Sequence, residues 1–128
     1  MLGDRMCAAM LPAGDFERAK QWYADKLGLK PIDESPAGAE YQCADGTRFS
    51  VYPSEFAGSN RATAMGWLVS DINAEMEELK SAGVTFEEYD IPGVKTEGGV
   101  ALLGDEKGAW FKDSEGNILS IFESPRYK

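Results

Sequence analysis

The sequence contains no histidine, so its candidates for chemistry are carboxylates, tyrosines and two cysteines. Without an imidazole, the chain lacks the commonest general base near neutral pH and the commonest transition-metal ligand. Nucleophilic catalysis by a serine–histidine or cysteine–histidine pair is therefore excluded. A Mg²⁺ or Ca²⁺ site built from carboxylates alone stays open in principle, and Asp113, Glu123 and Tyr52 are the groups for acid–base work.

The two cysteines, Cys7 and Cys43, fall in segments that we expect to be strands. We interpret both as buried free thiols rather than as a disulfide, because no secretion signal accompanies them. Their spacing matches no metal-binding motif.

The formal net charge of −9 limits the kinds of molecule that the protein is expected to bind. It argues against nucleic acid, whose phosphates require lysine and arginine, and against anionic membranes. Two interpretations remain: the acidity serves solubility, or it favours cationic ligands. No apolar run approaches the roughly 20 residues that span a bilayer, and the N-terminus lacks the layout of a signal peptide, so we expect a cytoplasmic protein.

Two amphipathic helices are predicted to organise the chain, at Asp15–Gly28 and Asp71–Gly83. In each, the aspartate caps the free N–H groups of the first turn, and the glycine suits the left-handed residue that ends a helix. The two starts lie 56 residues apart (71 − 15) in a chain of 128. A short apolar run precedes each helix, at Met6–Leu11 and at Ala64–Val69. This repetition predicts two β-α-β-β-β modules.

The remaining strands are predicted from apolar runs between turn signals, with Asp45-Gly46 as the strongest two-residue hairpin signal. They are Leu29–Asp33, Glu40–Ala44, Thr47–Tyr52, Val84–Tyr89, Ala109–Lys112 and Ile118–Glu123. The glycine-rich stretch Ile91–Lys107 breaks the symmetry, as a functional loop or as an exposed loop with a short strand at Val100–Leu103. We expect one domain over 1–128, with a first module at 5–53, a linker at 54–63 and a second module at 64–124.

Two phrases carry a family resemblance: DFERAKQWYADKLGL at Asp15–Leu29 and AWFKDSEGNILSIFE at Ala109–Glu123. They resemble the signatures of the vicinal oxygen chelate superfamily, which includes glyoxalase I, extradiol dioxygenases and bleomycin-resistance proteins. Ser114 departs from the proline usual in the second phrase. The resemblance implies an α+β fold, two modules whose curled mixed sheets form a cleft, and a homodimer. The cleft would lie within one chain or between swapped modules.

Metal-binding members of that superfamily hold a divalent ion on four strands, and the resemblance places those positions at Ala8, Ser50, Met65 and Ser120. None of these side chains can hold a catalytic divalent ion. Glu123 is the nearest carboxylate to the last position, but strand alternation turns it to the opposite face. We therefore expect no metal, no cofactor and no catalytic residue.

Strand alternation then sorts the side chains between a concave face and a core that faces the helices. Met6, Val69 and Ile118 join the concave set, while Cys7, Ala9, Leu11, Phe49, Val51, Leu68, Leu119 and Ile121 join the core. Either Trp110 or Phe111 faces inward, and the sequence leaves that choice open. The candidate ligand-binding residues are Met10, Arg48, Ser50, Tyr52, Met65, Trp67, Trp110, Ser120 and Phe122. For Trp67 and Tyr52, plain packing on the sheet is the competing interpretation.

The expected function is that of a metal-free, bleomycin-resistance-like protein that sequesters a small aromatic or cationic molecule in an apolar cleft. One alternative is a lyase, isomerase or dioxygenase-type enzyme with atypical metal ligands. Another is a non-catalytic regulatory or partner module with a filled cavity, in which Met65, Trp67 and Phe122 would pack together. No nucleic acid or membrane partner is expected.

Overall fold

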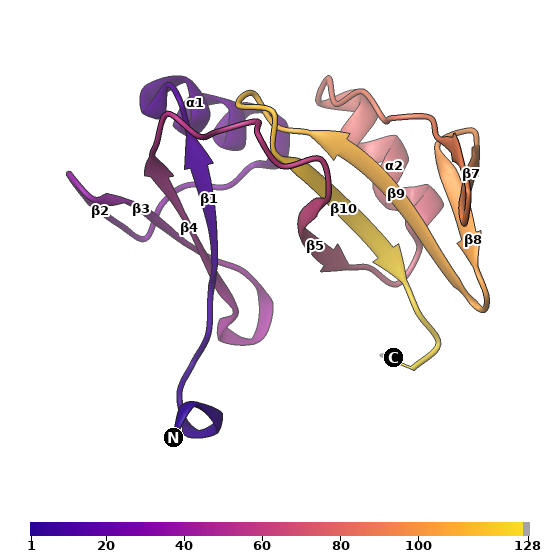
Figure 1. Ribbon diagram of the computed structural model, residues 1–128, viewed down its shortest axis with the longest axis horizontal. Helices are drawn as coiled ribbons and strands as arrows, with labels where there is room; N and C mark the ends of the chain where they lie inside the picture. The colour runs from indigo at the N-terminus through magenta and orange to yellow at the C-terminus, as the bar shows by residue number, and fades with distance from the viewer. Residues whose placement is uncertain (127–128) are drawn as a thin grey trace.

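The computed structural model describes residues 1–126, and residues 127 and 128 of the predicted single domain lie outside the described residues. Two α-helices and two mixed sheets, of four and six strands, make up the fold. The predicted α+β class is therefore confirmed. Figure 1 shows the sheets as two lobes side by side, which are not closed around a cleft.

The first lobe is a four-stranded sheet with the order β1-β4-β3-β2. Its elements are η1 (Leu2–Asp4), β1 (Ala9–Ala13), α1 (Phe16–Leu27), β2 (Asp33–Ser35), β3 (Gly38–Gln42), η2 (Ala44–Gly46) and β4 (Arg48–Pro53). β1 begins later than predicted and runs through Pro12, which an edge strand accommodates because the missing N–H faces away from the ladder. Cys7 consequently precedes the strand and is exposed, whereas we predicted a buried thiol.

The hairpin turn between β3 and β4 has the predicted chemistry. Asp45 and Gly46 have φ angles of 57° and 74°, both in the left-handed region. The N–H of Thr47 donates to the carbonyl of Ala44 at 3.1 Å, which closes a two-residue turn of the type that matches strand twist. The hairpin prediction is confirmed.

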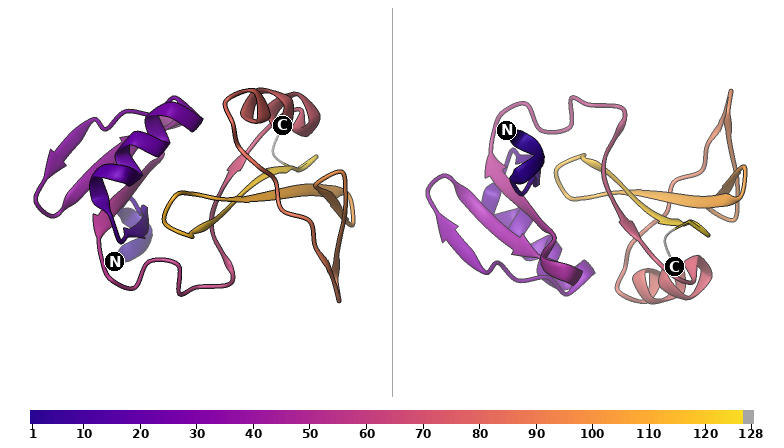
Figure 2. Two further views of the ribbon diagram at one scale, coloured as in Figure 1. Left: turned by 90° about the horizontal axis from the view of Figure 1, so that it is seen from above. Right: turned by 90° about the horizontal axis from the view of Figure 1, so that it is seen from below.

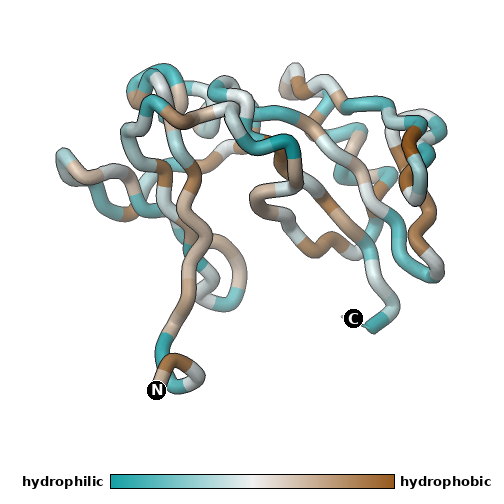
Figure 3. The backbone as a smooth tube through the Cα atoms, viewed as in Figure 1, coloured by the Kyte–Doolittle hydropathy of each residue, from teal (hydrophilic) through white to brown (hydrophobic). Residues whose placement is uncertain are grey.

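The second lobe is a six-stranded sheet with the order β5-β10-β9-β8-β7-β6. Its elements are β5 (Thr63–Leu68), α2 (Ile72–Ser81), β6 (Asp90–Ile91), β7 (Val94–Glu97), β8 (Val100–Leu103), β9 (Glu106–Lys112) and β10 (Ile118–Glu123). The predicted strand Val84–Tyr89 was wrong: this segment makes a single bridge, between Phe86 and Phe111. The glycine-rich stretch folds into short hairpins, which extend the sheet outward. The backbone path of this region lies at the right of Figure 3, which has the same view as Figure 1.

The helix-covered faces of the two sheets share one hydrophobic core. Tyr23 of α1 packs on Phe49 of the first sheet, at 5.8 Å between ring centroids. Phe49 in turn meets Trp67 of the second sheet edge-on, at 5.9 Å. Trp22 of α1 stacks against Phe111 of β9 at 6.3 Å. The opposite faces of both sheets, which we call the open faces, are therefore left toward solvent.

Figure 2 shows the irregular segment that joins β4 to β5 and crosses between the lobes. The two ends of the described chain lie on the same side of the molecule, at the bottom of the view in Figure 1. Among residues 1–126, no helix combines the length and the apolar character that crossing a membrane requires.

Candidate ligand-binding site

Three of the predicted ligand-binding residues, Met10, Ser50 and Tyr52, lie together on the open face of the first sheet. The parallel pairing of β1 with β4 sets Met10 beside Ser50, and strand alternation puts Tyr52 on the same face. The three side chains line a recess of about 190 Å³, which we call the open-face recess. Met10 is 66% exposed there, so its thioether is free to adapt to a ligand.

Two carboxylates give this recess its charge. Asp33 of β2 and Glu40 of β3 line it, with Glu40 opposite Ser50 across the β3–β4 ladder. Arg48 donates from Nη1 to Oε1 of Glu40 at 2.6 Å, so this predicted ligand residue is engaged in an exposed ion pair. An aromatic ring, a thioether and acidic groups on one surface suit a flat or cationic molecule.

Trp110, Ser120 and Phe122 lie on the open face of the second sheet. Ser120 pairs with Trp110 across the β9–β10 ladder, and the indole N–H of Trp110 donates to Oγ1 of Thr63 at 3.0 Å. Phe111 points the other way and is fully buried in the core, which decides the orientation that the sequence left open. Gly66 lies beside Ser120, and a Cβ at that position would collide with the serine hydroxyl.

Met65 and Trp67 lie on the opposite side of β5 from the one predicted. Both pack against the hydrophobic core, whereas Leu68, predicted as core, is 43% exposed. The pairing of β5 with β10 shifts at Ile118, and a shift of one residue turns every side chain of a strand to the other face. The predicted cluster of Met65, Trp67 and Phe122 consequently does not form, because Phe122 is on the other face.

The four positions that the resemblance assigns to metal ligands carry no suitable donors. With the corrected register, the second-module position on the open face beside Ser120 is Gly66 in place of Met65. Ala8, Ser50, Gly66 and Ser120 offer two hydroxyls and neither a carboxylate nor an imidazole, which a catalytic divalent ion does not fit. Within residues 1–126, no cluster of three or more metal-ligating side chains was found elsewhere.

The three candidate acid–base groups lie apart. Tyr52 is in the open-face recess, and Glu123 is at the end of β10, where it pairs with Lys107 at 3.7 Å. Asp113 is buried between the lobes and accepts a hydrogen bond of 2.7 Å from the hydroxyl of Tyr23. The structure therefore does not assemble these three groups into one site.

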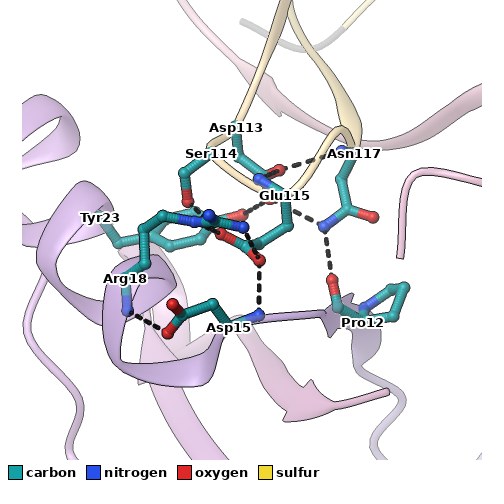
Figure 4. A network of polar contacts seen from close by, with 8 residues as sticks. All are labelled: Pro12, Asp15, Arg18, Tyr23, Asp113, Ser114, Glu115 and Asn117. Atoms are coloured by element: carbon teal, nitrogen blue, oxygen red, sulfur yellow. Dashed lines mark hydrogen bonds and ion pairs between the residues drawn. The ribbon is translucent and has the colours of Figure 1, made fainter. Parts of the chain in front are cut away.

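Asp113 belongs to a polar network that we call the inter-lobe clamp: Pro12, Asp15, Arg18, Tyr23, Asp113, Ser114, Glu115 and Asn117 (Figure 4). Its carboxylate also accepts the backbone N–H groups of Glu115 and Asn117, at 2.8 and 2.9 Å, and the side-chain amide of Asn117 at 2.8 Å. Burial, followed by the neighbouring Asp113 charge, raises the pKa of the Tyr23 hydroxyl, which stays a donor. This aspartate is fully occupied as a structural acceptor.

Glu115 makes the second half of the clamp, and its side chain is only 1% exposed. Arg18 donates to it from Nε at 2.8 Å and from Nη2 at 3.0 Å. The backbone N–H of Asp15 and the hydroxyl of Ser114 complete the set, at 2.8 and 2.7 Å. Burial acts to raise the pKa of Glu115, but these donors outweigh it and lower the pKa to about 2. The serine that departs from the family's usual proline thus contributes a donor here.

The comparisons with known proteins agree with this fold. The family model described as "Glyoxalase/Bleomycin resistance protein/Dioxygenase superfamily" matches residues 5–121. A comparison with curated proteins gives no match.

Solved structures resemble the chain at low sequence identity. A glyoxalase/bleomycin resistance protein from Catenulispora acidiphila is 23% identical, with 94% of this chain and 98% of that chain covered and a TM-score of 0.66. The oxidase ChaP-H2 is 21% identical, with 94% of each chain covered and a TM-score of 0.66. TnmS3, an antibiotic-binding protein from Streptomyces sp. CB03234, is 20% identical, with 97% and 98% covered and a TM-score of 0.63. The family match spans most of the sequence, and the chain therefore belongs to the glyoxalase/bleomycin resistance protein/dioxygenase superfamily.

Proposed function

We propose that this protein binds a small aromatic or cationic molecule at the open-face recess and does so without a metal. The observation that carries the proposal is the convergence of Met10, Ser50 and Tyr52 with the acidic Asp33 and Glu40 on one surface. The ring of Tyr52 offers a face for stacking. The carboxylate of Asp33 attracts positive charge, while that of Glu40 is already paired with Arg48. The net charge of −9 raises the local concentration of cations around the whole molecule.

A binding role is favoured over catalysis by the chemistry of the open faces. The positions that hold a metal in catalytic relatives contain alanine, serine and glycine here, and the acid–base candidates are dispersed. Among the structural neighbours, TnmS3 is described as an antibiotic-binding protein, which accords with sequestration on the same fold.

We further propose that the cleft is completed between two copies of the chain. The recess of about 190 Å³ is smaller than the roughly 300–1,000 Å³ typical of ligand pockets, so a second surface has to enclose a drug-sized ligand. The two sheets of one chain are separate and do not close around a cleft. Met10, which is exposed on the open face of the first sheet, is an apolar group that a second copy would cover. Light scattering should then give twice the 14.0 kDa mass of one chain.

The test is a calorimetric titration with bleomycin, a second cationic aromatic antibiotic and a neutral aromatic control. We expect saturable binding of the cationic compounds at the recess, lost in Tyr52→Ala and retained in Tyr52→Phe, which keeps the ring. Tyr52 is suitable because it is not among the buried core residues, whereas substitution of Trp67 would open a cavity in the core. A flat response, or equal binding by the Tyr52→Ala variant, would refute the assignment to the recess.

A further inference from the structure

A separate cavity of about 380 Å³ lies between the lobes on the helix-covered side, away from the open faces. We call it the inter-lobe cavity. Leu27 and Leu29, at the end of α1, form one wall, and Leu79 of α2 forms another. Cys43 of the β3–β4 turn and Trp67 of β5 approach from either lobe. Its volume lies in the range of small-molecule pockets, and its lining is apolar except for Glu75.

An ordered aromatic surface forms part of this cavity. The indole of Trp67 is nearly parallel to the ring of Phe111, at 10° and 6.4 Å between centroids. Its N–H donates to Sγ of Cys43 at 3.4 Å, which fixes the orientation of the ring. A flat apolar group entering the cavity therefore meets an aromatic surface whose only polar atom is already engaged.

A larger acidic basin of about 840 Å³ adjoins the inter-lobe cavity, and the two share Leu68, Val69 and Glu75. Glu75, Asp105 and Glu123 line the basin, and none of the lysines and arginines within residues 1–126 does. Asp105 and Glu123 already have cationic neighbours, Arg126 at 3.3 Å and Lys107 at 3.7 Å.

Glu75 differs from the other two carboxylates. Within residues 1–126, its carboxylate has no ion pair and no hydrogen bond, although the side chain is partly buried on α2. It stands at the boundary between the apolar cavity and the acidic basin. A half-buried, uncompensated carboxylate beside an aromatic surface has the complementarity that an amine on a hydrophobic body requires.

We propose that the inter-lobe cavity is a second binding site, specific for amphiphilic amines. The flat apolar body lies against Trp67, and the protonated amine binds Glu75 at the edge of the basin. Anionic amphiphiles are disfavoured by the uncompensated charge of Glu75. This site shares no residue with the open-face recess and does not depend on the function proposed above.

The test uses dansylcadaverine, which joins a naphthalene ring to a primary amine, and its neutral N-acetyl derivative. Binding to the full chain is measured by calorimetry at low ionic strength, where screening is weak. Because dansylcadaverine also fits the ligand class proposed for the open-face recess, the titration is carried out in the Tyr52→Ala background. There we expect one saturable site per chain, and affinity about tenfold lower when Glu75→Gln is added, since a charge-assisted contact is lost. The N-acetyl probe should bind both proteins equally weakly.

Glu78→Gln is the matched control, because it removes the same charge from an exposed position of the same helix that lines neither cavity. It should bind dansylcadaverine as the wild type does. Ala44→Phe, at the exposed rim of the cavity, should obstruct the aromatic body and abolish binding. Equal loss in Glu75→Gln and Glu78→Gln, no saturable site, or loss in Tyr52→Ala would overturn the proposal. Loss of binding in Tyr52→Ala would show that dansylcadaverine binds at the open-face recess. Failure of the antibiotic titration would count against the open-face recess and not against the inter-lobe cavity.

Discussion

The two helices of the molecule follow one sequence plan but have different attachments. In each, an aspartate Oδ1 accepts the N–H three residues ahead at 3.1 Å, from Arg18 in α1 and from Ala74 in α2. Beyond the cap, Arg18 and Tyr23 of α1 donate hydrogen bonds to the carboxylates of the inter-lobe clamp. Among the described residues, no side chain of α2 makes a hydrogen bond or ion pair to the other lobe. Its Glu75 instead borders two cavities.

This difference shows that the repeated sequence pattern specifies a helix. Which other elements that helix contacts is determined by residues outside the repeated pattern. The clamp residues of α1 are a buried tyrosine and an arginine whose partner carboxylate is buried. Buried polar groups with full sets of partners are rigid and costly to disrupt. α1 therefore joins the lobes, and α2 is left free to line a binding surface.

The largest expected effect is at the centre of the clamp. Asp113→Ala should lower the free energy of unfolding by about 3–5 kcal/mol, because it leaves the Tyr23 hydroxyl, two backbone N–H groups and one of the two N–H bonds of the Asn117 amide without an acceptor. Urea denaturation measures the change. Asp105→Ala is the matched control, since its exposed pair with Arg126 should contribute less than about 1 kcal/mol. Equal losses of stability in the two variants would show that the clamp contributes no more to stability than an exposed ion pair.

Acid should weaken the clamp through Glu115. Its folded-state pKa is about 2, below its ordinary value of 4.5, so its contribution is fully present above pH 4.5 and is lost as the pH falls toward 2. That contribution is on the order of 3 kcal/mol. Glu115→Gln should be less stable than the wild type at pH 7, and the gap should narrow between pH 4.5 and pH 2. A gap that stays constant in urea melts across this range would contradict the assignment.

The smallest expected loss of stability comes from removing a helix cap, and it should be the same for the two helices. Asp15→Ala and Asp71→Ala should each cost about 1 kcal/mol, because each removes one acceptor of identical geometry from a first turn. Thermal unfolding of the two single variants provides the comparison. A much larger loss for Asp15→Ala would mean that the cap and the clamp are energetically coupled through the backbone N–H that Asp15 donates to Glu115.

The features predicted correctly from the sequence are those with local causes. The ends of α1, the Asp45-Gly46 turn and the limits of β10 depend on capping, left-handed residues and alternation within a few positions. The family phrases were equally informative, because they coincide with α1 and with the β9–β10 hairpin. The limits of the modules at 5–53 and 64–124 remain a proposal.

The features that the sequence did not reveal depend on contacts between distant segments. The face of β5 is set by its pairing with β10, whose register shifts at one residue, so Trp67 was assigned to the wrong side. The inter-lobe cavity needs walls from α1, a turn of the first sheet and α2, which share no local pattern. A signal for the clamp was present in the Asp113–Asn117 turn, but its partners on α1 could not be identified from spacing.

The inter-lobe clamp also constrains the order in which the chain folds. Its bonds join residues 90 positions apart for Tyr23 and Asp113, 97 for Arg18 and Glu115, and 105 for Pro12 and Asn117. During synthesis, α1 leaves the ribosome before the turn that fastens it has been made. Loop closure over such separations is slow, so the first half of the chain spends that interval with its tyrosine and arginine unengaged. Synthesis that pauses before residue 113 should leave that half accessible to chaperones and proteases.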